Sequence, residues 1–92
     1  MDKIYLDNSA TTPICDAALD RMTAVYRDEW GNPSSVHGMG VSAGKILTEA
    51  KKTVLSALGS APMKGDVIFT SGGTEADNWA IFSTVKRFGK RG

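Results

Sequence analysis

The sequence predicts an α/β fold that is incomplete, so that the isolated fragment should be mostly helical. Three segments repeat apolar residues at the three- and four-residue steps of an amphipathic helix. Only one short run, residues 67–70, has the β-branched and aromatic character of a buried strand. One strand cannot make a sheet, because its backbone N–H and C=O groups need a neighbouring strand. The pattern therefore predicts an unfinished sheet in a partial chain.

The first part of the chain should be extended and then helical. Residues 4–7 form a short extended stretch, and residues 8–13 form a loop of small hydroxyl-bearing residues that ends at Pro13. Proline can precede a helix start, and Asp16 suits a cap or a first-turn acid. The first helix is expected over residues 16–27. Its apolar face consists of Ala18, Leu19, Met22, Val25 and Tyr26.

The middle of the chain should hold the clearest helix. Residues 30–35 combine Gly, Asn and Pro and therefore predict a turn. From about Val41 an apolar stripe follows, and Gly59 is a natural left-handed residue to end the helix. The stripe consists of Ala43, Leu47, Ala50, Val54 and Leu58.

The last part should run from loop to strand, glycine turn and helix. Residues 60–66 form the loop, residues 67–70 the strand, and residues 71–73 the turn, with the helix ending at Gly89. The apolar residues of this helix are Ala76, Trp79, Ala80, Ile81, Val85 and Phe88. We therefore divide the chain into residues 1–60 and residues 61–92.

Composition and charge exclude several classes of protein. The 92 residues include 11 basic and 10 acidic side chains, for a net charge of +1, which provides no footprint for nucleic acid or an anionic membrane. The basic cluster of Lys86, Arg87, Lys90 and Arg91 is interpreted as favourable charge at a helix C-terminus. No signal peptide or membrane span is recognised, so a soluble cytoplasmic protein is expected.

The strongest local signal for chemistry is the turn after the predicted strand. A helix N-terminus has unpaired N–H groups and partial positive charge, so Gly72 and Gly73 could bring backbone close to a phosphate, with Thr74 adding a hydroxyl. Glu75 should face away from such an anion. The turn matches neither common nucleotide loop. Taken alone, it is weak evidence for a phosphate site, and an ordinary strand-to-helix turn in which Ser71 or Thr74 caps the helix is the preferred interpretation.

The histidine and the cysteine suggest no reactive centre by themselves. His37 and Cys15 are the only residues of their types and lie far apart, so no metal site and no internal disulfide are expected. His37 suits a surface or capping position. Cys15 has no basic neighbour in sequence and is interpreted as an incidental thiol.

Three segments together resemble a known family. Residues 5–13, 31–37 and 69–78 are similar, in order and interval, to motifs of cysteine desulfurases in the class V aminotransferase group. The resemblance covers about residues 3–88, and the loop around residues 62–65 is a little longer than the family pattern.

The resemblance implies the N-terminal fragment of a fold-type-I pyridoxal phosphate enzyme, normally a homodimer. Such enzymes convert L-cysteine to L-alanine and an enzyme persulfide, whose sulfur passes to iron–sulfur scaffold proteins, thiolated tRNA and other acceptors. Gly73 and Thr74 would contact the cofactor phosphate. Residues 1–60 would begin the small domain, and residues 61–92 the large cofactor-binding domain. The residues implied near the substrate entrance are Ala10, Thr11, Asn32 and His37.

The same resemblance implies that the catalytic residues lie outside these segments. The family's Schiff-base lysine follows a histidine in a later motif, and its sulfur-accepting cysteine is also later; no lysine here matches, nor does Cys15. The isolated chain should therefore be inactive, expose apolar surface and form oligomers. Two alternatives remain: a non-catalytic helical interaction module and a phosphate-ligand binding module. Substitutions at Gly73 and Thr74 would distinguish them.

Overall fold

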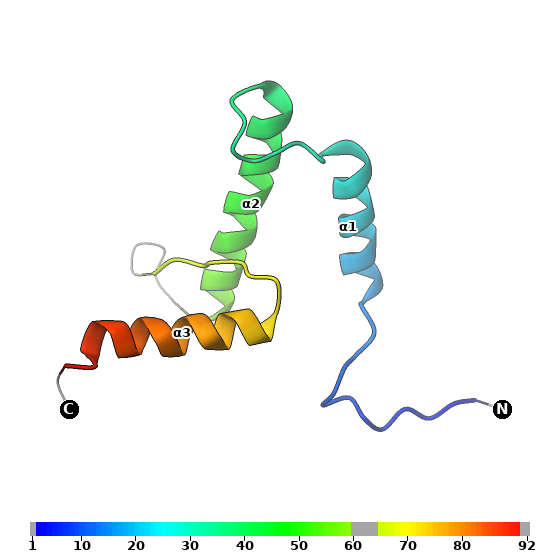
Figure 1. Cartoon of the computed structure of the whole chain (residues 1–92). Coiled ribbons are helices and arrows are strands. Elements are labelled where there is room, and N and C mark those ends of the chain that lie inside the picture. Colours follow the sequence, from blue (N-terminus) through cyan, green and yellow to red (C-terminus); the bar gives the residue numbers. More distant parts are fainter. Residues whose placement is uncertain (1, 60–64, 91–92) are drawn as a thin grey trace. The chain divides into compact units, whose positions relative to one another are not determined.

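The computed structural model describes residues 2–59 and 65–90 and contains three helices in these ranges (Figure 1). They are α1 (Asp16–Asp28), α2 (Gly38–Ala57) and α3 (Gly73–Phe88). The chain divides into two units, Met1–Glu49 and Ala50–Gly92. The boundary that we predicted at residue 60 lies outside the described residues.

In the first unit, α1 forms where the apolar spacing predicts it and extends one residue further, to Asp28. Asp16 lies in its first turn and Arg27 in its last, where each charge complements the helix dipole. Cys15 occupies the N-cap position without a side-chain hydrogen bond to the helix. At the other end, the Glu29 N–H donates to the Val25 carbonyl, and the Glu29 carboxylate accepts a hydrogen bond from the Ser42 hydroxyl.

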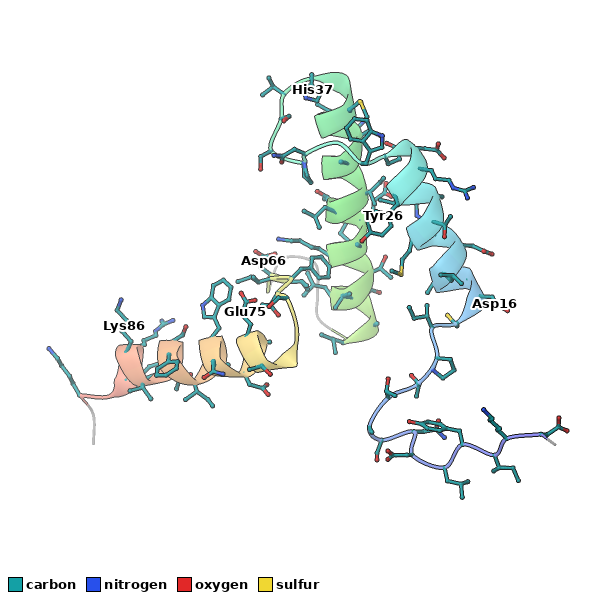
Figure 2. The ribbon with its side chains drawn as sticks, turned by 45° about the vertical axis from the view of Figure 1, so that its right-hand side comes forward. Asp16, Tyr26, His37, Asp66, Glu75 and Lys86 are labelled. Carbon is teal, nitrogen blue, oxygen red and sulfur yellow. The ribbon has the colours of Figure 1, made fainter. Side chains whose placement is uncertain are left out.

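α2 begins at Gly38, three residues before the predicted start at Val41. The earlier start follows from His37, whose Nδ1 accepts a hydrogen bond from the Gly40 N–H at 3.4 Å and whose carbonyl accepts one from Val41 at 3.0 Å. Figure 2 shows His37 at this end of the helix. At the other end, Gly59 has a φ of 74°, which confirms the predicted left-handed residue.

In the second unit, the predicted strand is wrong as an element: residues 67–70 have no assigned secondary structure, and the described ranges contain no strand. A strand needs a partner for its backbone groups, and no described segment pairs with this one. Ile68 and Thr70 instead line a shallow hollow against one face of α3. The α3 residues around this hollow are Ala76, Trp79, Ala80 and Ser83.

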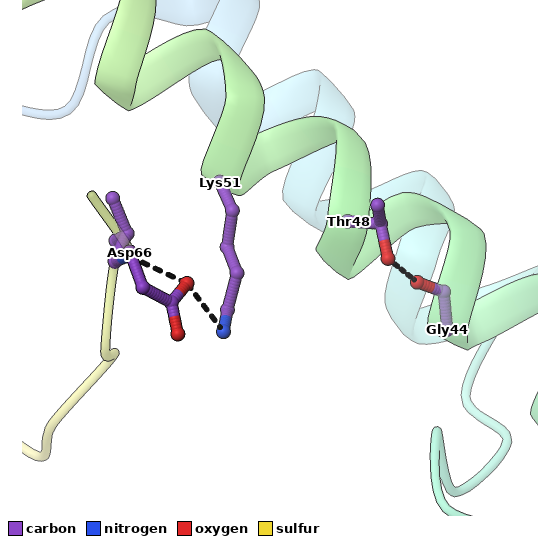
Figure 3. Close-up of polar contacts among 5 residues, drawn as sticks. Gly44, Thr48, Lys51 and Asp66 are labelled. Atoms are coloured by element: carbon purple, nitrogen blue, oxygen red, sulfur yellow. Dashed lines mark hydrogen bonds and ion pairs between the residues drawn. The ribbon is translucent and has the colours of Figure 1, made fainter. Parts of the chain in front are cut away.

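An ion pair between Asp66 and Lys51 links the segment before residue 67 to α2. The Asp66 carboxylate oxygen Oδ1 lies 3.3 Å from the Lys51 Nζ and accepts the Val67 N–H at 2.8 Å (Figure 3). Both side chains are solvent-exposed to some degree, at 33% for Lys51 and 72% for Asp66, so the pair contributes little to stability. Most of the loop predicted over residues 60–66 lies outside the described residues.

α3 confirms the third predicted helix and ends before Gly89, whose N–H donates to the Val85 carbonyl at 2.7 Å. Lys86 and Arg87 lie in its last turn, as the interpretation of the basic cluster requires. Arg91, the last member of that cluster, lies outside the described residues.

The described residues bury almost no apolar side chain. Ala43, at 7% exposure, is the one buried hydrophobic residue among them, whereas Leu6 and Val36 are 88% and 95% exposed. The predicted exposure of apolar surface is therefore confirmed. None of the described helices is long and apolar enough to cross a membrane.

Candidate functional site

The predicted phosphate turn lies at the N-terminus of α3. Gly72 is the N-cap residue, with extended backbone angles of φ 167° and ψ 179°, and no side chain caps the helix. The first hydrogen bond of the helix is donated by the Ala76 N–H to the Gly72 carbonyl, at 3.1 Å. The N–H groups of Gly73, Thr74 and Glu75 precede it and therefore have no acceptor within the helix. The alternative that Ser71 or Thr74 caps α3 is wrong.

The two glycines of this turn meet open space. A Cβ added to Gly72 or Gly73 would have no heavy atom within 4 Å. Neither residue has the positive φ that favours glycine, since Gly59 alone has it among the described residues. The conformation of the described chain therefore does not require glycine at either position. An open backbone surface beside free N–H groups has the form that a closely approaching anion needs.

Glu75 differs from the sequence-based expectation. Its carboxylate does not turn away from the glycine turn but folds back, and Oε2 accepts hydrogen bonds from the Ser71 N–H at 2.9 Å and from the Ser71 hydroxyl. These two bonds lower the pKa of the Glu75 carboxyl, and desolvation opposes them. The physical reason is local, because the Glu75 side chain is long enough to reach back to the N–H and hydroxyl of Ser71, just before the helix start.

Two further bonds hold the backbone on either side of Gly73 and Thr74. The Thr70 hydroxyl donates to the Gly72 carbonyl at 2.9 Å, and the Asn78 amide donates to the Thr74 carbonyl at 2.8 Å. Both use carbonyl oxygens, so they occupy none of the N–H donors at the helix start. Residues 70–75 thus combine a fixed backbone with free donors.

The second predicted group, Asn32 and His37, lies in one loop before α2. The Asn32 side-chain oxygen accepts the Ser34 N–H at 2.9 Å, and its carbonyl accepts the Ser35 N–H at 2.9 Å. With Nδ1 of His37 accepting from the Gly40 N–H, the predicted capping position is confirmed. Both residues therefore stabilise the loop in which they stand.

Two glycines of residues 31–40, Gly31 and Gly40, are required by the chain itself. A Cβ on Gly31 would lie 2.6 Å from the Met39 carbonyl carbon and oxygen. A Cβ on Gly40 would lie 2.7 Å from the Asn32 carbonyl oxygen and would overlap the Ser35 carbonyl oxygen as well. Gly40 is accordingly one of the few buried residues. Residues 31–40 form a tightly closed loop.

Ala10 and Thr11 are separate from this loop in the contacts that the structure shows. The Ala10 N–H closes a turn onto the Asp7 carbonyl at 3.1 Å, and both residues are exposed. Within the described residues, no hydrogen bond joins Ala10 or Thr11 to Asn32 or His37. Gly73 and Thr74 belong to the other unit.

Sequence reasoning missed the bond between Ser71 and Glu75. A capping box places its acid three residues after the capping hydroxyl, whereas here the spacing is four. A search for a hydroxyl residue followed four positions later by an acid, across a pair of glycines, would have found it. The described part of the chain holds no group of three metal-ligating side chains, and Cys15 is a free, exposed thiol.

Comparison with known proteins adds evidence that is independent of geometry. Residues 4–92 match the family model described as aminotransferase class V. A selenocysteine lyase of Bos taurus is 44% identical over 88 residues, which are 96% of this chain and 20% of the relative. A cysteine desulfurase of Cereibacter sphaeroides is 45% identical over 85 residues, 92% of this chain and 22% of the relative.

A third relative, the cysteine desulfurase NifS of Azotobacter vinelandii, is 41% identical over 86 residues, 94% of this chain and 21% of the relative. The chain thus spans about a fifth of the length of these curated relatives. No solved structure matches it.

Proposed function

Because the chain belongs to the class V aminotransferase family, we propose that it is the N-terminal part of a pyridoxal-phosphate-dependent cysteine desulfurase. The complete enzyme would convert L-cysteine to L-alanine and retain the sulfur as a persulfide for acceptor or iron–sulfur scaffold proteins. A homodimer of the complete enzyme is part of the same proposal. Two of the relatives, from Cereibacter sphaeroides and Azotobacter vinelandii, are cysteine desulfurases, in line with this proposal.

The observation that carries the proposal is the open double-glycine turn at the start of α3. A Cβ at Gly72 or Gly73 would touch nothing, and the N–H groups of Gly73 and Thr74 have no acceptor within the helix. These residues fit the phosphate group of pyridoxal phosphate, which carries oxygen acceptors and negative charge. When bound, the cofactor supplies an electron sink for cleavage of bonds at the amino acid.

The contribution of this chain is binding and orientation. Gly73 and Thr74 would fix the phosphate through backbone N–H groups, and the hydroxyl of Thr74 would add a further donor. Ala10, Thr11, Asn32 and His37 would lie near the substrate entrance of the complete enzyme. Asn32 and His37 also hold the loop of residues 31–40 in its closed form, so their effect on substrate would be through loop shape.

The amino acid that the complete enzyme accepts has two candidates. Relatives called cysteine desulfurase and selenocysteine lyase match this chain at 45% and 44% identity, so the comparison favours neither. Cysteine and selenocysteine differ only in the chalcogen atom. Both amino acids are therefore tested as substrates.

The proposal can be tested in a chimera. The matching fifth of the Cereibacter sphaeroides cysteine desulfurase is replaced by this chain, and cofactor content and alanine release from cysteine and selenocysteine are measured. We expect a cofactor-loaded enzyme that releases alanine. A second chimera with Gly73→Val should lose cofactor, because the new side chain would fill the phosphate position. A folded chimera that fails to bind pyridoxal phosphate would overturn the proposal.

The isolated 92-residue chain should be inactive. By the family resemblance, the catalytic lysine and the sulfur-accepting cysteine would be supplied by other segments of the complete enzyme. Alanine release by the purified chain, above that of buffer with free cofactor, would contradict this expectation. Binding of a partner protein without any response to Gly73→Val would favour the helical interaction module instead.

A further inference from the structure

The structure contains one side chain that reaches across the proposed phosphate turn. Glu75 is the third residue of α3, and its carboxylate returns to Ser71, which lies outside the helix (Figure 2 shows Glu75 near the start of α3). A single oxygen, Oε2, accepts both the Ser71 N–H, at 2.9 Å, and the Ser71 hydroxyl. Glu75 therefore links the chain before the glycines to the helix after them.

We propose that Glu75 is a positioning residue of the glycine turn, which ties Ser71 to the first turn of α3 and leaves the N–H groups of Gly73 and Thr74 as the donors for a bound phosphate. The part of this inference that concerns a phosphate rests on the proposed function. The tie itself is a property of the chain and can be tested without any ligand.

The need for such a tie follows from the two glycines. Glycine reaches more backbone conformations than any other residue, so two in succession leave the turn poorly determined. No side chain packs at the Cβ position of Gly72 or Gly73, because no heavy atom beyond the adjacent chain lies within 4 Å of it, and the Thr70 hydroxyl restrains the Gly72 carbonyl alone. A bond from Glu75 to Ser71 closes a ring around both glycines and limits the orientations of their N–H groups.

The tie also decides which donors a phosphate could use. Ser71 has an N–H and a hydroxyl that would otherwise compete for an anion, and the Glu75 carboxylate accepts from both. The Ala76 N–H is bonded to the Gly72 carbonyl. The remaining N–H groups of the turn are those of Gly72, Gly73, Thr74 and Glu75, which have no acceptor within the helix. An anion would therefore be centred on the helix start and away from Ser71.

The negative charge of Glu75 repels a phosphate, whereas its hydrogen bonds to Ser71 orient the turn. These two effects of Glu75 can be separated. Hydrogen bonds from Ser71 stabilise the ionised carboxylate, which lowers the pKa of Glu75. The other charged side chains of this unit on α2, on the segment before α3 and on α3 include Lys51, Lys52, Asp66, Asp77, Lys86 and Arg87. Within the described residues no ion pair links any of them to Glu75. Its hydrogen bonds to Ser71 thus dominate its surroundings.

The tie should depend on pH in one direction. Since the pKa of Glu75 is lowered in the folded turn, the tie is fully present above the ordinary glutamate range and is lost as the pH falls through the lowered value. Asp77 lies on the same helix and makes no bond to the turn among the interactions of the described residues. It provides a matched control for loss of one negative charge.

The test is amide hydrogen exchange of Ser71 and Gly72 in the 92-residue chain, measured by NMR at neutral pH. Three variants are compared with the parent: Glu75→Ala, Glu75→Gln and Asp77→Asn. We expect Glu75→Ala to speed exchange of the Ser71 amide by about tenfold, as loss of a charge-assisted hydrogen bond implies. Glu75→Gln keeps a carbonyl acceptor and should stay within about threefold of the parent. Asp77→Asn should change nothing.

Each result bears on the tie directly. Unchanged exchange in Glu75→Ala, with helix content by circular dichroism equal to the parent, would overturn the proposal. An effect of Asp77→Asn as large as that of Glu75→Ala would also overturn it, because charge rather than the bond would then be responsible. Rescue by Glu75→Gln supports positioning by the hydrogen bond.

A titration with pyridoxal phosphate tests the role of the turn in binding a phosphate separately from the bond between Glu75 and Ser71. Pyridoxal phosphate is added to the parent chain and to Glu75→Ala, and the amide shifts of Gly73 and Thr74 are followed. We expect saturable shifts in the parent and binding about tenfold weaker in the variant. Shifts centred on Ser71 would overturn the assignment of donors. No shift in a parent chain whose Ser71 exchange still depends on Glu75 would sink the phosphate function and support the tie.

Discussion

The chain contains two glycine-bearing loops that each lead into a helix, and they differ in what requires the glycines. In residues 31–40, which lead into α2 and include its first residues, a Cβ on Gly31 or Gly40 would collide with backbone atoms of the same segment. In the turn before α3, a Cβ on Gly72 or Gly73 would touch nothing. The packing of the first loop on itself therefore accounts for Gly31 and Gly40. The second has glycines that the described chain does not require, as expected where a ligand approaches the backbone closely.

The two loops also differ in how the helix start is satisfied. α2 is preceded by a residue whose side chain accepts from the helix, because His37 Nδ1 receives the Gly40 N–H. α3 has no side-chain cap, and Glu75 instead accepts from Ser71, one residue before the N-cap position. The donors at the start of α3 therefore remain open. A loop that closes on itself serves structure, whereas an open and oriented one is suited to binding.

Of the substitutions that test this difference between the loops, Gly40→Ala should cause the largest loss of folding stability. The new Cβ would overlap the Asn32 and Ser35 carbonyl oxygens, which the turn at Asn32 holds in place. Overpacking of this kind costs about 1–3 kcal/mol, which exceeds the roughly 1 kcal/mol that alanine gains over glycine in a helix. Denaturant unfolding followed by circular dichroism should show lower stability.

Gly38→Ala is the matched control in the same helix. A Cβ there has no heavy atom within 4 Å, so stability should be unchanged or slightly raised. Equal stability of the two variants would mean that the loop of residues 31–40 is not closed as described.

The second effect should come from Gly73→Ala, which separates folding from binding. The added methyl group meets no atom of the described chain, so helix content should be equal to that of the parent or higher. In the chimeric enzyme, the same change should weaken cofactor binding by about tenfold or more, roughly 1.4 kcal/mol, because the phosphate can no longer approach the backbone. Fluorescence or absorbance titration with pyridoxal phosphate measures this loss. A fall in helix content would mean that the fold requires Gly73, as it requires Gly31 and Gly40 in the first loop.

The smallest effect should come from His37, whose cap bond is long at 3.4 Å. His37→Ala removes the acceptor and should reduce the stability of the α2 start by about 0.5–1 kcal/mol. His37→Asn restores a side-chain oxygen at a capping position and should recover most of it. Amide exchange at Gly40 and Val41 reports the change. If alanine and asparagine behave alike, the cap is not what starts α2 at Gly38.

Sequence reasoning located the helices well because helical bonds are local. α1, α3 and the end of α2 just before the left-handed Gly59 follow from apolar spacing and from residues within a few positions of each end. The same reasoning placed the glycine turn at a helix N-terminus. It missed the start of α2, because the His37 cap bond has no strong sequence signature, and it misjudged Glu75, because its partner lies one residue beyond the usual capping pattern.

The amino-acid sequence by itself therefore determined the three helices, the left-handed Gly59 and the place of the two glycine loops, since each depends on neighbours along the chain. The tertiary structure alone decided that residues 67–70 form no strand, that Gly31 and Gly40 are required, and that Gly72 and Gly73 are open. These outcomes depend on atoms that approach through space. A strand needs a partner segment for its backbone bonds, and the room for a Cβ depends on which atoms pack beside it.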